Sequence, residues 1–382
     1  MDSDDSDDSD DVEIQEFYMF IRLIMSVALK RREWKKKKQE SEKKEVEAKR
    51  KLFKKEKTES FKKYCRRLRS LPHLYKEEVF VPGEVVERVM EAIESDGIAE
   101  NWTFSAHEQS VMYLQFATSG QSFGCMRRRI GASKSTISSI VKRVSRVIIQ
   151  HIPTVRLPSS PSEWREIEET FVRRGLLRCI GCLDGKHVRV KAPPGTGSLF
   201  YNYKSYFSIS MLALADADLR FRYLDIGAPG SVSDTSIFNR TFLKTILDTR
   251  ATLPPPVHYN DHLVLPSFVL ADGIFALTPT LMKPFGRAQL THEQTIFNRI
   301  LSNSRVRVEH AFGVLASRFR VLHSQIELPY SDAVNFVSSL VHLHNLLIPP
   351  FVGPLEPVVE AATEQFHDGK DQREALLDFL IN

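Results

Sequence analysis

One apolar segment of this sequence carries an acid in its interior. The stretch GCLDGKHVRVKAPP runs from Gly181 to Pro194, continues the apolar pair Cys179-Ile180, and has Asp184 near its start. A continuous apolar run bounded by turn residues is typical of a buried strand, where an ionised carboxylate is costly without a partner. Asp184 is therefore either a capped or salt-bridged core residue, or a metal ligand that needs further acids from distant parts of the chain.

The segments that follow predict a mixed α/β domain with a β-β-β-α-β-α order. We expect strands over Arg178–Val190, Ser205–Ala215 and Leu219–Gly227, forming an antiparallel meander, and a short buried strand ending at Asp272. We expect helices starting near Asp234 and over His292–Phe319, Ser331–Leu347 and Gln372–Leu380, with a Pro-rich connection before the fourth strand. This order matches the ribonuclease-H-like catalytic core, in which the first and fourth strands lie side by side.

Three acids occupy matching places in that order. Asp184 lies in the first strand, Asp272 at the end of the fourth, and Glu309 on the long helix, with 36 residues between the last two. Two divalent ions activate a water and stabilise the leaving oxygen when a phosphodiester is cleaved. Mg²⁺ prefers oxygen ligands, so carboxylates suit it. Asp234 is a fourth candidate, with a helix N-cap or first-turn acid as the alternative reading.

The cysteines give little support to another metal. The chain has four cysteines in 382 residues, which is no disulfide framework. Cys179 and Cys182 form a CxxC pair, but no second pair of ligands at zinc spacing accompanies it. We interpret the two as small apolar side chains on a strand.

Charge is concentrated near the N-terminus. Residues 1–29 carry a net −8, residues 30–69 carry 20 Lys and Arg against 7 Glu, and the remainder is neutral. The acidic repeat predicts a disordered tail, and the Lys-rich segment predicts a charged helix. That helix is a solvated surface, a nuclear-import signal or a nucleic-acid arm. No stretch is long and apolar enough to predict a membrane span.

A helix–turn–helix rhythm precedes the strands. Phe123–Ile130 reads as a short helix, Gly131 lies at the turn, and Ser133 caps the next helix. The exposed start of that helix offers donors for phosphates and base edges: Lys134, Ser135, Thr136 and Ser138. A plain helical hairpin is the alternative, and the turn glycine and polar start favour DNA binding.

Together these motifs resemble a known family. GCLDGKHVRVKAPP, YLDIGAPGSVSDTSIFNRT, LADGIFAL and SNSRVRVEHAFGVLASRFRVL are similar to the DDE transposase domain of the PIF/Harbinger superfamily. They are also similar to the Harbinger-derived nucleases that animals retain as host genes. The resemblance covers about residues 105–350 and includes a helix–turn–helix upstream.

The resemblance implies specific roles. Asp184, Asp272 and Glu309 fall at the catalytic positions, and Asp234 falls at an additional acidic position often treated as a metal ligand. The implied cofactor is Mg²⁺ or Mn²⁺, and the implied partners are DNA and a separately encoded Myb/SANT-like protein. Arg305 falls on the helix motif one turn from Glu309, where it would hold DNA phosphate or orient an acid.

One position departs from the family pattern. Ala276 stands where a proline usually follows the aromatic after the third acidic position. Proline would stiffen the exit from the strand, so its loss could loosen the site, but it removes no ligand.

The expected organisation has five parts. These are an acidic tail (1–29), a basic helical arm (30–80), a helical DNA-binding region (82–155), a DDE nuclease domain (175–350) and a C-terminal tail with a short helix (351–382). The expected function is a metal-dependent DNA endonuclease or transposase in the nucleus, with the cytoplasm and a homo-oligomer left open. The alternatives are a catalytically silent DNA-binding or regulatory protein on the same scaffold, and a chromatin-associated protein that depends on the charged arm.

Overall fold

The structure, a computed structural model, describes residues 8–97, 103–260, 263–286, 289–349 and 368–381. It divides into two compact units. The smaller comprises residues 1–61 and 129–132, and the larger comprises residues 62–128 and 133–382. The described residues contain no helix long and apolar enough to cross a membrane.

The smaller unit is dominated by one long helix, α1 (Asp8–Ser70), whose last residues belong to the larger unit. The predicted disordered tail is therefore wrong from Asp8 onward, while residues 1–7 lie outside the described part of the chain. The predicted basic helix is confirmed as the continuation of α1, with exposed ion pairs at i,i+4 spacing such as Glu45–Lys49.

Helices form the first half of the larger unit. They are α2 (Leu74–Glu78), α3 (Gly83–Ser95), α4 (Ala106–Ser119), α5 (Phe123–Ile130), α6 (Lys134–His151) and α7 (Pro161–Val172). Helix α6 begins where predicted, because the Ser133 hydroxyl accepts a hydrogen bond from the Thr136 N–H at 3.0 Å. Its apolar face is buried against α3, α4 and α11.

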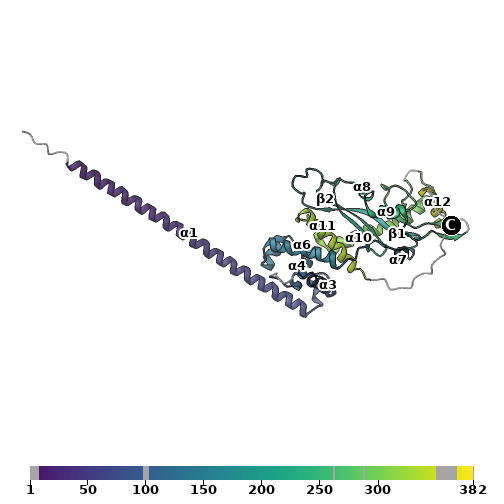
Figure 1. Cartoon of the computed structure of the whole chain (residues 1–382), viewed down its shortest axis with the longest axis horizontal. Coiled ribbons are helices and arrows are strands. Elements are labelled where there is room, and N and C mark those ends of the chain that lie inside the picture. Colours follow the sequence, from purple (N-terminus) through teal and green to yellow (C-terminus); the bar gives the residue numbers. More distant parts are fainter. Residues whose placement is uncertain (1–7, 98–102, 261–262, 287–288, 350–367, 382) are drawn as a thin grey trace, which may run out of the picture. The chain divides into compact units, whose positions relative to one another are not determined.

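A five-stranded mixed sheet forms the second half, in the order β3-β2-β1-β6-β7 (Figure 1). Its strands are β1 (Cys179–Arg189), β2 (Ser208–Ala215), β3 (Phe221–Pro229), β6 (Phe268–Leu270) and β7 (Leu281–Met282). The predicted antiparallel meander is confirmed, and the first strand lies beside the strand before Asp272, as expected; the structure shows that this pair is parallel. This half of the chain is therefore mixed α/β, as the sequence predicted.

Two connections differ from the prediction. The helix expected near Asp234 is two short helices, α8 (Asp234–Phe238) and α9 (Phe242–Thr249), because Thr241 caps a new helix through its hydroxyl. The Pro-rich connection contains a separate two-stranded sheet of β4 (Val257–Asn260) and β5 (Leu263–Leu265).

Three helices complete the larger unit: α10 (His292–Arg318), α11 (Tyr330–Leu346) and α12 (Gly369–Ile381). A capping box starts α10, in which Thr291 and Gln294 satisfy each other's backbone N–H groups. A short 3₁₀ helix, Arg320–His323, follows it. Helices α7 and α10 both pack on β1, so the central strand is buried by side chains from distant parts of the chain.

The two central cysteines are part of this packing. Cys179 and Cys182 are free thiols and fully buried in β1. The Cys182 thiol donates to the Ser304 carbonyl of α10 at 3.3 Å. Both therefore fill the core, as the sequence suggested.

Candidate active site

The pairing of β1 with β6 places two acids level with each other. Cys182 lies opposite Leu270 in this parallel pair. Asp184 and Asp272 each follow two residues after this pair, Asp184 still within β1 and Asp272 just beyond the end of β6, so both acids lie near the same end of the paired strands. The carboxylate of each accepts a hydrogen bond from the N–H of the glycine that follows, at 2.9 Å for Asp184 and 2.7 Å for Asp272.

A bulge in β1 sets this register. Two residues lie between Cys179 and Cys182 on β1, whereas one lies between their partners, Phe268 and Leu270, on β6. Gly181 lies in the bulge with φ +151°, and a Cβ there would come within 2.6 Å of the Leu214 side chain. Because successive side chains of a strand point to opposite faces, a β1 without the extra residue would turn Asp184 to the other face relative to Asp272.

Helix α10 covers the face that carries Asp184. Cys182 reaches the Ser304 carbonyl, and Asp184 lies two residues on, so it shares that face. One turn beyond Ser304, the long helix carries Glu309, whose carboxylate forms an ion pair with Arg305 at 2.8 Å. Glu309 is therefore placed on the helix that faces Asp184, but its nearest charged partner is its own helix neighbour.

Asp234 reaches the site from α8. The N-cap of this helix is Ser233, whose hydroxyl accepts from the Ser236 N–H at 3.2 Å, so Asp234 is not the cap. Its carboxylate lies directly against Gly185, where any Cβ would clash with all three carboxylate atoms. The residue after the first acid is thus required to be glycine by a second acid.

Electrostatics links all four acids. The pKa of Asp184 is raised to about 6, chiefly by burial and also by the charges of Glu309 and Asp234, against the opposing effects of the Gly185 N–H hydrogen bond and of Arg305. Burial also raises the pKa of Asp234, to which Asp272 contributes in the same direction. Glu309, Asp234 and Asp272 therefore each disfavour the ionised form of a neighbouring acid, which is typical of carboxylates gathered to bind a cation.

The donor set fits a hard divalent cation, since all four side chains offer only carboxylate oxygens. In their present positions the described residues contain no group of three or more His, Cys, Asp or Glu side chains close enough to hold a metal ion. The Arg305–Glu309 ion pair contributes to this, because it holds Glu309 on its own helix. A shared ion would have to compete with Arg305 for that carboxylate.

A lysine that sequence reasoning missed stands beside the acids. Lys204 lowers the pKa of Asp234, and it also lowers the pKa values of Lys186 and His187 after the larger effect of burial. It lies in the loop between β1 and β2, where the buried Asn202 accepts from the Lys204 N–H at 2.9 Å. The signal in the sequence was an Asx turn, Asn202-Tyr203-Lys204, inside an aromatic stretch.

The two residues that flank the first acid have local partners. The Lys186 ammonium lies 5.6 Å from the Phe312 ring centroid on α10. His187 lies 3.1 Å from the Ser208 hydroxyl and contacts the edge of Tyr203. Neither is a free surface cation, since both are partly buried.

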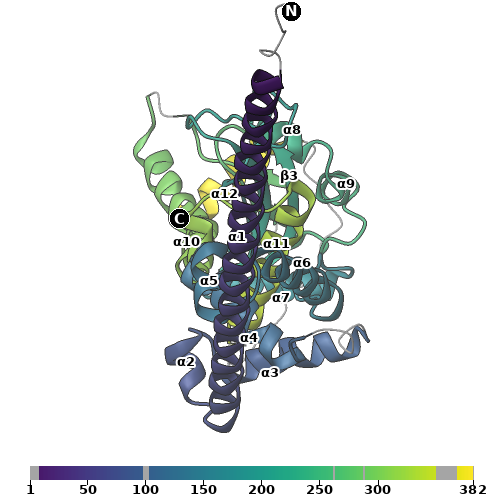
Figure 2. The ribbon, with the colours of Figure 1, turned by 90° about the vertical axis from the view of Figure 1, so that its left-hand side faces the viewer.

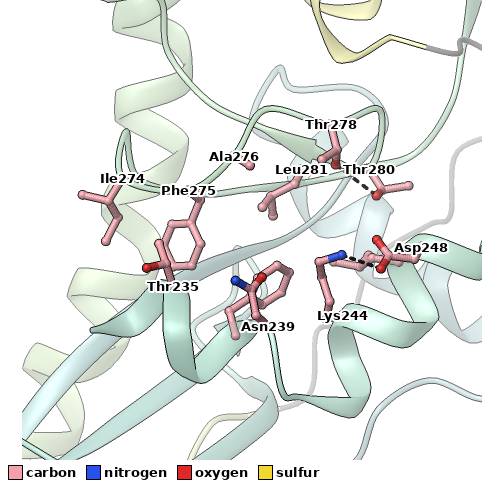
Figure 3. Close-up of a pocket in the computed structure, with 12 residues that line it drawn as sticks. Thr235, Asn239, Lys244, Asp248, Ile274, Phe275, Ala276, Thr278, Thr280 and Leu281 are labelled. Carbon is pink, nitrogen blue, oxygen red and sulfur yellow. Dashed lines mark hydrogen bonds and ion pairs between the residues drawn. The ribbon is translucent and has the colours of Figure 1, made fainter. Parts of the chain in front are cut away.

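A pocket of about 230 Å³ lies next to two of the acids (Figure 3). Thr235, the neighbour of Asp234, lines one side, and Ile274, Phe275 and Ala276, which follow Asp272, line another. Figure 3 shows the Asn239 side chain on the α8 side of the pocket, with the Lys244–Asp248 ion pair of α9 nearby. Ala276 thus borders this pocket at the position where the resembled family has proline.

The predicted DNA-binding residues lie at the start of α6, away from these acids in the chain. Lys134 and Ser135 are exposed, and Thr136 and Ser138 are partly exposed. The hydroxyls of Ser135 and Thr136 each lie 2.7 Å from the Ser133 hydroxyl, so both take part in the helix cap. Lys134 and Ser138 remain the residues whose side chains are free of that cap.

Comparison with known proteins identifies a family match over the part of the chain that carries the acids. Residues 183–345 match the DDE superfamily endonuclease family. The resemblance drawn from the sequence is therefore confirmed, and the matched segment contains Asp184, Asp234, Asp272 and Glu309.

Several curated proteins are similar to this chain. "Protein ALP1-like" of Arabidopsis thaliana is 26% identical over 255 residues, covering 64% of this chain and 61% of that protein. "Putative nuclease HARBI1" of Homo sapiens is 25% identical over 273 residues, covering 68% of this chain and 74% of that protein, and its Rattus norvegicus counterpart is also 25% identical, over 274 residues. The chain thus spans about three fifths of the length of the Arabidopsis relative. No solved structure matches the chain significantly.

Proposed function

We propose that this protein is a metal-dependent DNA endonuclease of the Harbinger type, with Asp184, Asp234, Asp272 and Glu309 as its acidic site. The observation that carries the proposal is the electrostatic linkage of these four carboxylates, which come from β1, α8, the segment after β6, and α10. The match to DDE endonucleases and the similarity to a protein named as a nuclease support the same reaction class.

The four acids would hold Mg²⁺ or Mn²⁺. Such ions supply an activated water and stabilise charge on the phosphate and leaving oxygen during hydrolysis. The chain's own residues have defined tasks around them. Gly185 leaves space for the Asp234 carboxylate, and Lys204 offsets part of the negative charge of the four acids. Arg305 would keep Glu309 in an ion pair until a bound cation takes its place.

The basic part of α1 and the start of α6 would add DNA affinity to this site. Residues 30–69 carry a net +13, which favours sequence-independent contact with phosphates. Lys134 and Ser138 lie at the exposed start of a capped helix, as in a recognition helix. We also propose nuclear localisation through the Lys-rich segment, and a Myb/SANT-like partner in DNA recognition.

A catalytically silent DNA-binding protein is the second candidate, and the Arg305–Glu309 ion pair favours it, because this pair engages one of the four acids. Incubation of supercoiled plasmid with Mg²⁺ or Mn²⁺ separates the two. If the protein is a nuclease, it should nick the plasmid, and EDTA should abolish the nicking. An Asp184→Asn, Glu309→Gln double variant should not nick it. If wild-type protein binds the plasmid without nicking it, with and without a candidate Myb-like protein, the silent protein is the better account.

The matched control is Asp225→Asn. Asp225 lies on β3 of the same sheet, and burial raises its pKa, but its charged neighbour is Arg240 rather than another of the four acids. Its substitution should leave nicking unchanged. A loss of nicking in this variant would mean that the effect is not specific to the four proposed acids.

A further inference from the structure

The C-terminal helix α12 returns to the edge of the catalytic sheet. It packs against α10, β5 and β7, and Figure 2 shows α12 next to α10. The buried Gln372 amide donates to the Pro266 carbonyl at 3.2 Å, and Leu376 is fully buried. At the helix start, a Cβ on Gly369 would come within 2.6 Å of the Thr278 backbone, so the helix is seated closely on the segment after Asp272.

This seating brings an arginine to a pocket beside Asp272. The pocket has a volume of about 480 Å³, and its wall includes Asp272 and three cations from three different elements. The cations are Lys283 after β7, Arg305 on α10 and Arg373 on α12. The wall of the pocket therefore carries more positive than negative side chains.

Arg373 is held in place by an aromatic ring. Its guanidinium lies 3.8 Å from the Phe285 ring centroid, close enough for a cation–π interaction. Phe285 is itself fixed, because the Asn298 side chain bonds its backbone N–H at 2.8 Å and its carbonyl at 3.1 Å, and Phe297 packs edge-on against its ring. A planar cation held in this way loses little freedom when it binds a phosphate.

The other polar atoms of the pocket are largely committed. The Lys283 ammonium donates to the Gly273 and Phe275 carbonyls at 3.1 and 2.8 Å, which fixes the backbone just after Asp272. Arg305 is paired with Glu309. The Arg373 Nε, in contrast, is buried and has no hydrogen-bond partner among the described residues. Of the three cations, Arg373 is the one that has no hydrogen bond or ion pair with the described residues, so an incoming anion would displace no partner from its guanidinium.

We propose that this pocket binds a DNA phosphate next to the scissile one, and that Arg373 is its principal cation. The inference rests on the proposed nuclease function, because that function brings DNA to Asp272. It assigns a part in substrate binding to a helix outside residues 183–345, the segment that matches the endonuclease family. Arg373 would thus position the DNA backbone, and the acids would act on the neighbouring phosphate.

The test is the salt dependence of binding to a short duplex DNA of mixed sequence, measured with EDTA so that hydrolysis plays no part. Arg373→Met keeps an unbranched side chain over Phe285 and removes the charge. One lost phosphate contact should reduce the slope of log K against log salt by about 0.9. Lys370→Met removes an exposed charge from the same helix outside the pocket wall and should leave the slope unchanged.

A wild-type slope in Arg373→Met, or an equal decrease in Lys370→Met, would overturn the inference. Thermal unfolding of both variants shows whether α12 remains seated. Plasmid nicking is measured alongside. If wild type nicks the plasmid but Arg373→Met has the wild-type slope, the phosphate-binding role of the pocket is rejected and the nuclease function stands. If Arg373→Met has a decreased slope but wild type does not nick the plasmid, the pocket binds phosphate and the nuclease function is rejected.

Discussion

The carboxylate of Asp234 lies against Gly185 so closely that no side chain could replace the glycine hydrogen. Two acids far apart in the sequence, Asp184 and Asp234, are thereby brought to the same point of β1. The contact shows how a short helix after β3 can deliver a carboxylate to a strand that is two positions away in the sheet. It also makes this glycine a sensitive place to test the site.

Gly185→Ala should displace Asp234 and reduce metal-dependent nicking by about 10- to 100-fold, the usual range when the surroundings of a metal ligand are disturbed. Gly273→Ala is the matched control. Gly273 follows Asp272 as Gly185 follows Asp184, but a Cβ there has nothing within 4 Å. Equal activity of the two variants in a plasmid-nicking assay would contradict the role given to Asp234.

The raised pKa of Asp184 predicts a pH-dependent cost to stability. Burial raises its folded-state pKa to about 6, above the value of about 3.9 for an unfolded Asp, so the folded protein binds this proton more tightly. The resulting stabilisation is present below about pH 4 and is lost as the pH rises through about 6.

Asp184→Asn cannot ionise and should therefore unfold at a higher urea concentration than wild type at pH 8, in the presence of a chelator. The difference should shrink as the pH is lowered through the same window. An advantage that is equal at pH 8 and below about pH 4 would show that packing, rather than ionisation, causes it.

Lys204 should support the acidic site, because its positive charge partly offsets the negative charge of Asp234. It is the cation that lowers the pKa of Asp234, and it is exposed at the surface next to the acids. Lys204→Met should weaken DNA binding and nicking by about tenfold, the effect of one charge-assisted contact. Lys191→Met, which removes an exposed charge just beyond β1, serves as the control, and a similar loss there would mean that surface charge in general is responsible.

A buried ion pair fixes the start of β1. Arg178 bonds both carboxylate oxygens of Glu168 at 2.9 and 3.0 Å, and its side chain is 3% exposed. Arg178→Met would leave Glu168 buried without its partner, which should reduce the free energy of unfolding by about 3–5 kcal/mol. Arg156→Met breaks a pair whose arginine is 67% exposed and should cost less than about 1 kcal/mol in the same denaturation experiment.

The sequence predicted the main sheet because its central strands are apolar and end at clear turn signals. The meander follows from that pattern. The proximity of Asp184 to the segment after β6 was anticipated in another way, from the match of the element order to a ribonuclease-H-like core, and the pattern did not give the parallel direction of that pair.

Other features depend on contacts that no local pattern encodes. Strand β7 has two residues, too few for any periodicity. The bulge at Gly181 is visible only from the register of two strands, and the place of Lys204 beside Asp234 requires the fold of a loop. The short C-terminal helix was predicted, but its return to Asp272 depends on tertiary packing alone.

If the four distant acids form one cation site, Mn²⁺ binding measured by electron paramagnetic resonance should detect it. Wild-type protein should bind Mn²⁺, and separate Asn or Gln substitutions of the four acids should each weaken binding at least about tenfold. Asp225→Asn should bind as wild type does. Wild-type affinity in all four variants, or an equal loss in Asp225→Asn, would contradict the account.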